Sequence, residues 1–135
     1  MRGLLPCTSF GSYRLGFTLE GELVGHIAER VAELVQIPSV NPLHAGAKSG
    51  DDGERAIASW LADHADALGA EVVVDEVLDG RCNVYARFEG TSDRAVTIDV
   101  HLDTVGVEHM PDNPFDGRIE DGRAYGRGSV DTKPT

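Results

Sequence analysis

The sequence predicts an α/β domain in which helices pack on a β-sheet and functional side chains lie at strand ends. Two stretches with apolar residues at helical spacing come first, and short β-branched runs separated by turn signals follow. The length of 135 residues suits one small domain, given the usual size of roughly 100–200 residues. A hydrophobic fraction of 41% is ordinary for a globular protein, so the chain can bury a core.

The chain is acidic, with a net charge of −11. Nucleic acids and anionic membrane surfaces would both repel it, so we expect neither as a partner. No apolar run approaches the roughly 20 residues that a membrane-spanning helix needs. Cys7 and Cys82 lie far apart and form no Cys-x-x-Cys pair, so we expect two free thiols in a cytoplasmic protein rather than a disulfide.

Residues 1–17 contain two arginines, three glycines and a proline, but no acidic residue. Leu4-Leu5 is too short an apolar core for a signal peptide, and the glycines and the proline would disrupt the amphipathic helix of a transit peptide. We therefore expect a disordered leader of unknown role, followed by one domain over residues 18–135.

The first helix is predicted over residues 18–37. Its apolar residues recur at helical spacing and form one stripe, and Pro38 ends the helix because proline cannot continue it. The members of the stripe are Leu23, Ile27, Val31, Leu34 and Val35.

The second helix is predicted to follow a polar, glycine-rich loop over residues 44–53 and to end near Leu68, before Gly69. Asp51 or Asp52 would accept hydrogen bonds from the first free amides of this helix. Its predicted inner face comprises Ile57, Trp60, Leu61, His64 and Leu68.

Three strands and a hairpin are predicted after the helices. Short runs of β-branched and aromatic residues indicate the strands, and Asp-Gly pairs are typical of two-residue hairpin turns. The elements are strands over residues 71–77, 82–88 and 95–100, a turn at Asp79-Gly80, and a hairpin over residues 119–125 around Asp121-Gly122.

The strand over residues 95–100 leads directly into His101-Leu102-Asp103. Side chains at positions i and i+2 of a strand share one face, so His101 and Asp103 should project together. Imidazole is a common zinc ligand, and a neighbouring carboxylate can orient the ring. Asp131 follows a Gly-Arg-Gly turn that can bend sharply and present a carboxylate. A metal site is one interpretation, and solvated side chains at a strand end are the other.

A longer string of residues around this pair resembles one enzyme family. It comprises His101-Leu102-Asp103-Thr104-Val105, Asn113-Pro114-Phe115, Tyr125-Gly126-Arg127-Gly128 and Asp131-x-Lys133. In order and spacing the string resembles the zinc-dependent exopeptidase and amidohydrolase family, which includes acetylornithine deacetylase, succinyl-diaminopimelate desuccinylase, aminoacylase and carboxypeptidase G. Residues 34–42 also look like the opening helix and turn of that family, so the resemblance begins near Leu23.

The resemblance implies the N-terminal portion of a zinc-exopeptidase-like catalytic domain, with helices packed on a mixed β-sheet. It implies His101 as a ligand of one metal ion and Asp131 as a carboxylate that bridges two. Asp103, in the catalytic role, would be the partner that fixes the His101 ring. The two divalent ions would be zinc, with cobalt or manganese as alternatives. We also expect Arg127 to anchor its loop by pairing with a carboxylate, and we do not expect His109 to be a ligand.

The implied reaction is hydrolysis of the amide bond of an N-acyl amino acid or small peptide by water that two metal ions activate. In the family, the general-base glutamate, further ligands and an inserted dimerisation domain come after the bridging aspartate. We therefore expect a truncated, inactive piece of a protein that is a homodimer at full length. Pro134 departs from the family, which has glycine after the lysine. The alternative is a non-catalytic α/β binding or structural domain.

Overall fold

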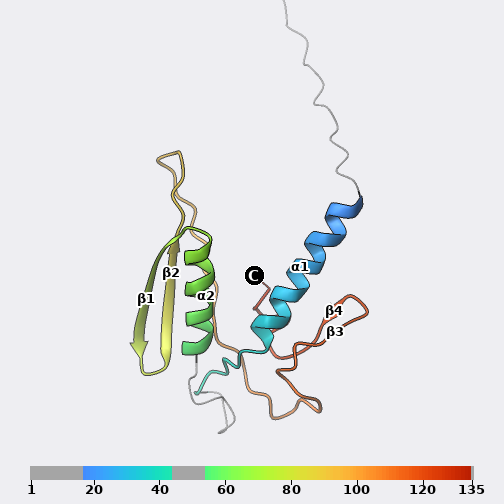
Figure 1. The fold of residues 1–135 in the computed structure, drawn as a ribbon. Helices are drawn as coiled ribbons and strands as arrows, with labels where there is room; N and C mark the ends of the chain where they lie inside the picture. Colours follow the sequence, from blue (N-terminus) through green and yellow to red (C-terminus); the bar gives the residue numbers. More distant parts are fainter. Residues whose placement is uncertain (1–16, 44–53, 135) are drawn as a thin grey trace, which may run out of the picture.

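The computed structural model describes residues 17–43 and 54–134, with side chains described from Gly25 onward (Figure 1). Along the described chain, the helices α1 and α2 precede two antiparallel hairpins, β1–β2 and β3–β4, so the fold is α/β as predicted. The predicted leader lies outside the described residues except for Phe17, the first residue of α1. The predicted loop over residues 44–53 also lies outside them.

Helix α1 spans Phe17–Val35, close to the predicted range, and its chain continues into a turn in which the Ile37 amide donates to Leu34 O at 3.2 Å. The predicted stripe is buried toward the end of the helix, where Val35 is fully buried and Val31 is 6% exposed. Ile27 is half-exposed, and the side chain of Leu23 lies outside the described part. The C-terminal half of α1 therefore supplies most of its described core contacts.

Helix α2 spans Arg55–Ala67 and ends where Gly69 adopts a φ of +88°, the left-handed conformation that glycine tolerates best. Ile57 on its predicted inner face is buried, whereas Trp60 is only half-buried and stacks on His64. Leu68 is exposed, so the predicted face is wrong at its last position, which is the C-cap beyond the helix itself.

The predicted capping residues Asp51 and Asp52 lie outside the described residues. Glu54 occupies the N-cap position of α2, but its side chain makes no capping hydrogen bond. Its buried carboxylate instead accepts from Arg81 Nε at 3.0 Å, and its backbone amide donates to Gly80 O at 3.0 Å. These contacts join the start of α2 to the turn of the first hairpin.

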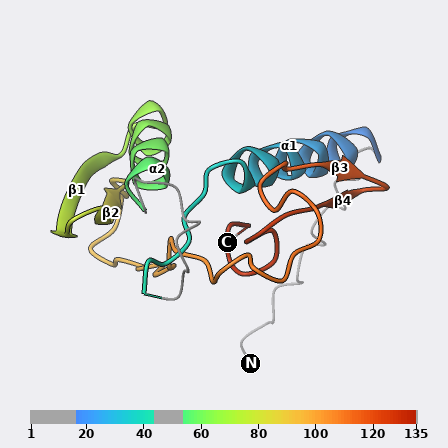
Figure 2. The same ribbon diagram turned by 90° about the horizontal axis from the view of Figure 1, so that it is seen from below.

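Strands β1 (Glu71–Leu78) and β2 (Arg81–Arg87) form an antiparallel pair around the predicted Asp79-Gly80 turn. Figures 1 and 2 show α2 lying along one face of this hairpin. Cys82 is buried as a free thiol, as predicted, and Cys7 lies outside the described residues.

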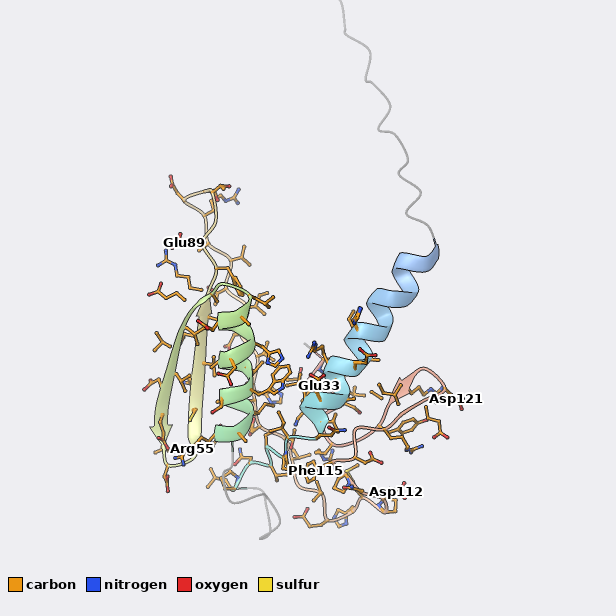
Figure 3. All side chains as sticks on the ribbon, in the orientation of Figure 1. Glu33, Arg55, Glu89, Asp112, Phe115 and Asp121 are labelled. Carbon is orange, nitrogen blue, oxygen red and sulfur yellow. The ribbon has the colours of Figure 1, made fainter. Side chains whose placement is uncertain are left out.

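Strands β3 (Ile119–Glu120) and β4 (Arg123–Ala124) form the second predicted hairpin, which lies beside α1 (Figures 1 and 2). The two turn residues, Asp121 and Gly122, both have positive φ values, +50° and +72°. This is the backbone that the right-handed twist of a two-residue hairpin requires. Figure 3 shows Asp121 at the tip of the hairpin.

The predicted strand over residues 95–100 is wrong. This segment forms no strand, and Val96 and Ile98 are 91% and 81% exposed. A β-strand is defined by hydrogen bonds to a neighbouring backbone, and no described segment pairs with these residues. The β-branched pattern therefore indicated a preference for extended backbone, but no described strand lies beside residues 95–100 to pair with them.

The mixed sheet implied by the family resemblance is also not found. The described strands form two separate antiparallel pairs, and the parallel contact among them is an isolated bridge between Val40 and Thr104. A mixed sheet needs strands that run parallel over several residues, and such pairing usually requires a long crossover connection.

Figures 1 and 2 show two groups of elements, α2 with β1 and β2, and α1 with β3 and β4. A contact of 3.5 Å between Arg30 Nη1 and His64 Nε2 joins the two groups. The Val40–Thr104 bridge links the segment after α1 to the segment between β2 and β3. Neither helix within the described ranges combines the length and the apolar character needed to cross a membrane.

Candidate functional site

Residues 39–41, which follow α1, form backbone hydrogen bonds with the segment that carries His101 and Asp103. Thr104 N donates to Ser39 O, and Asn41 N donates to Thr104 O, both at 2.8 Å. These bonds flank the parallel bridge between Val40 and Thr104, and all four residues are buried. Backbone pairing therefore fixes the position of the chain next to His101 and Asp103, although residues 95–100 form no strand.

The His101 ring is oriented by Asp103. His101 Nδ1 lies 2.9 Å from the backbone oxygen of Asp103 and 3.2 Å from its Oδ1. Both atoms are acceptors, so in a neutral ring these two contacts favour the tautomer with the hydrogen on Nδ1, which leaves the lone pair of Nε2 free. Asp103 Oδ2 in turn accepts from Asn41 Nδ2 at 2.6 Å. Arg81 Nη2 lies 4.0 Å from the same oxygen.

Asp131 reaches the other side of the ring. Its Oδ1 lies 3.3 Å from His101 Nε2, and both side chains are more than half exposed. Asp131 belongs to a tight turn that the Lys133 amide closes by donating to Gly128 O at 3.0 Å. The structure thus brings together all three residues singled out in the sequence, although the roles assigned to them stay predictions.

Lys133 ties this turn to the end of α1. Its Nζ donates to Leu34 O and Ile37 O, each at 2.6 Å, and the side chain is buried. Burial lowers the pKa of Lys133 to about 8, because removal from water disfavours the charged form. Carbonyl groups at a helix C-terminus carry partial negative charge, so a cation is favourable there.

A pocket of about 330 Å³ opens at this point, lined by residues 101, 103–105 and 126–131. His101, Asp131 and the Gly-Arg-Gly turn over residues 126–128 are all among its lining residues. A small organic molecule can therefore approach both side chains together.

The electrostatic surroundings of His101 act in opposite directions. Partial burial lowers the pKa of the imidazole, whereas hydrogen bonds to Asp103 and Asp131 and the charge of Asp103 raise it. The net effect is a pKa above the ordinary value of histidine. The two flanking carboxylates thus make the end of this segment attractive to a cation, whether a proton or a metal ion.

The prediction that Arg127 pairs with a carboxylate is wrong within the described residues. No carboxylate there lies within ion-pair distance, and Arg127 Nε is buried without a hydrogen-bond partner. The loop is anchored by backbone instead, because the Arg127 amide donates to Pro114 O at 2.6 Å. Gly126 makes this close approach possible, since a Cβ atom at that position would lie 2.8 Å from Pro114 O.

The described residues do not complete a metal site. His101 Nε2 and Asp131 Oδ1 are suitable zinc donors, but no third His, Cys, Asp or Glu side chain joins them in the described ranges. Asp103 faces Asn41 and the Nδ1 side of the ring. Because catalytic zinc normally has three protein ligands, two donors form only part of such a site.

Sequence reasoning missed the contacts that Asn41 and Lys133 make in this site. In the sequence, Asn41 belongs to the segment that resembles the opening helix and turn of the family, and Lys133 belongs to the motif that ends with Asp131-x-Lys133. Their partners lie 62 positions away for Asn41 and 99 and 96 positions away for Lys133. No local pattern signals contacts over such separations.

Comparison with known proteins shows that this chain is similar to parts of two proteins that are named as hydrolases. Over 115 residues, or 83% of this chain, it is 33% identical to a succinyl-diaminopimelate desuccinylase of Methylocella silvestris, of which it covers 28%. A second relative, an uncharacterized metallohydrolase of Methanocaldococcus jannaschii, is 27% identical over 120 residues, which make up 82% of this chain and 29% of the relative. No protein-family model matches the chain. The chain therefore spans less than a third of the length of the curated relatives that it matches.

Proposed function

We propose that this chain is part of a metal-dependent hydrolase that cleaves the amide bond of an N-acyl amino acid or a small peptide. The observation that carries the proposal is the approach of His101 Nε2 to Asp131 Oδ1, 3.3 Å apart, at the wall of an open pocket. The names of the two relatives, a desuccinylase and a metallohydrolase, support the same reaction class.

In this proposal His101 and Asp131 are two of the protein ligands, and the remaining ligands come from residues outside this chain. Zinc is the metal that suits a site of imidazole and carboxylate donors, with cobalt or manganese as substitutes. A pair of such ions, with Asp131 between them, would supply a Lewis acid and a water of lowered pKa. Asp103 holds the His101 ring in the tautomer that leaves Nε2 free to bind.

The test is hydrolysis by the full-length protein of N-succinyl and N-acetyl amino acids, with and without zinc. His101→Ala and Asp131→Ala should each lower kcat/KM by more than the roughly 10- to 100-fold that loss of an outer partner of a ligand costs. Asp103→Asn should fall within that smaller range. A chelator should abolish turnover, and added zinc should restore it.

His109→Ala is the matched control, because it removes an exposed imidazole that has no proposed part in the site. Its activity should equal that of the wild type. Unchanged turnover in both His101→Ala and Asp131→Ala would end the hydrolase proposal.

The second candidate is a non-catalytic α/β binding or structural domain, and the incomplete donor set within the described residues favours it. This function requires no metal. It predicts that zinc leaves the thermal unfolding midpoint of the 135-residue chain unchanged, whereas a ligand that binds the folded state raises that midpoint. A zinc-dependent rise that His101→Ala removes would exclude it.

A further inference from the structure

We propose that residues 34–41, at the end of α1, form a common platform that sets the separation between His101 and Asp131. Asn41 and Lys133 are the positioning residues that attach the two sides of the site to it. This inference rests on the proposed function for its meaning, but the geometry that it describes can be tested without metal.

The His101 side is attached through Asn41. The side-chain nitrogen of Asn41, Nδ2, donates to Asp103 Oδ2 at 2.6 Å, and Asp103 contacts Nδ1 of the His101 ring. The orientation of the Asn41 side chain is itself fixed, because its Oδ1 accepts from the Leu43 amide at 2.9 Å. Backbone bonds from Ser39 and Asn41 to Thr104 hold the same stretch of chain.

The Asp131 side is attached through Lys133. The Lys133 ammonium donates to Leu34 O and Ile37 O, both of which belong to the platform. The amide of the same residue closes the turn that presents Asp131 by donating to Gly128 O. Gly128 leaves room for the lysine stem, since a Cβ atom there would lie 2.9 Å from Lys133 Cδ and Cε.

The platform is rigid enough to serve as a reference. Val35 and Ser39 are fully buried, and Val40 is 1% exposed, so these three side chains are packed in the interior. Close-packed interiors transmit displacement rather than absorbing it. A change in either attachment should therefore move one side chain of the site relative to the other. The expected consequence is large, because a misplacement of about 1 Å in a reactive site can cost roughly 100-fold in rate.

The test compares Lys133→Met and Asn41→Leu in the full 135-residue chain, in chelator-treated, metal-free buffer. Both replacements keep the approximate size of the side chain and remove its hydrogen-bond donors. The readout is the nuclear Overhauser effect between the His101 ring protons and the Asp131 Hβ protons. We expect this contact in the wild type and its loss in each variant. Zinc binding by the full-length protein, measured separately, should weaken by about 10- to 100-fold in each variant.

Ile57→Ala is the matched control, because it removes a buried side chain from α2 without touching the platform. It should lower stability, yet keep both the ring-to-carboxylate contact and the zinc affinity of the folded protein. Retention of that contact in both Lys133→Met and Asn41→Leu would overturn the inference, and so would its absence in the wild type. A full-length wild type that shows the expected contact but binds no zinc would instead contradict the proposed function.

Discussion

His101 presents its two ring nitrogens to two different parts of the chain. Nδ1 faces Asp103 two positions on, and Nε2 faces Asp131 thirty positions on. An imidazolium donates from both nitrogens, so in the metal-free protein these acceptors favour the charged ring over the neutral one. The same arrangement that would bind a metal ion therefore also binds a proton, and the two should compete.

The pKa of His101 should consequently fall when Asp131 is replaced by Asn. Burial lowers this pKa, whereas hydrogen bonds to Asp103 and Asp131 and the charge of Asp103 raise it, and the net effect is an increase. Asparagine replaces the Asp131 carboxylate by a weaker, neutral acceptor, so the pKa of His101 should fall. A raised folded-state pKa contributes stability that is fully present below the unfolded value of about 6.5 and is lost as pH rises through the folded value. NMR titration of the His101 ring protons with chelator present measures the change.

Asp121→Asn is the control for this titration. It removes the same charge at the tip of the β3–β4 hairpin (Figure 3), where asparagine tolerates the positive φ. The His101 pKa should be unchanged in this variant. A pKa that also stays constant in Asp131→Asn would show that the two side chains do not interact.

The two sides of the site differ in how far sequence could predict them. His101 and Asp103 are two positions apart, so an extended backbone places them on one face without help from the rest of the fold. That expectation needed only the local backbone, and it survived the absence of the predicted strand. Asn41 contributes a contact across 62 positions, which local periodicity cannot encode.

The two hairpins show where local chemistry is sufficient. Asp-Gly pairs at Asp79-Gly80 and Asp121-Gly122 predicted both turns, because Gly80, Asp121 and Gly122 adopt positive φ values that few residues tolerate. Residues 95–100 show where it is not sufficient. Their β-branched pattern is as strong, but a strand also needs a partner backbone, and the described chain provides none.

The contact between the loop at Gly117 and α1 can be tested with a matched pair of substitutions. Gly117 and Gly122 have similar φ values, +62° and +72°. A Cβ atom at Gly117 would lie 2.5 Å from Ala32 O, whereas one at Gly122 would meet nothing within 4 Å. Gly122→Ala should cost roughly 1–2 kcal/mol from backbone strain alone. Gly117→Ala should cost about 1–3 kcal/mol more, because backbone atoms must move.

Urea unfolding of both variants measures these costs as free energies of unfolding. The difference between the variants isolates the steric contact, since the conformational penalty is common to both. Equal destabilisation would mean that the loop does not pack against α1 as described.

The molecule as a whole is organised around the end of α1. Residues 34–41 contact the segment that carries His101 and Asp103 through the Val40–Thr104 bridge and its flanking bonds, and they contact the Asp131 turn through Lys133. The sequence predicted the helix and its end at Pro38, but not that the turn would become the junction of the fold. Junctions of this kind depend on tertiary packing, which helix propensity and hydrophobic spacing do not report.

The net charge of −11 bears on the same site. An acidic protein raises the local concentration of cations near its surface, and this effect weakens with salt. The net charge therefore favours metal binding over the whole surface. The paired geometry of His101 and Asp131 determines where a metal ion would bind.

The most direct test of that location is zinc-edge anomalous diffraction from crystals of the protein soaked in zinc. The account predicts an anomalous peak between His101 Nε2 and the Asp131 carboxylate, and its disappearance from crystals of His101→Ala. Zinc peaks at other surface carboxylates, with none at this pair, would contradict it.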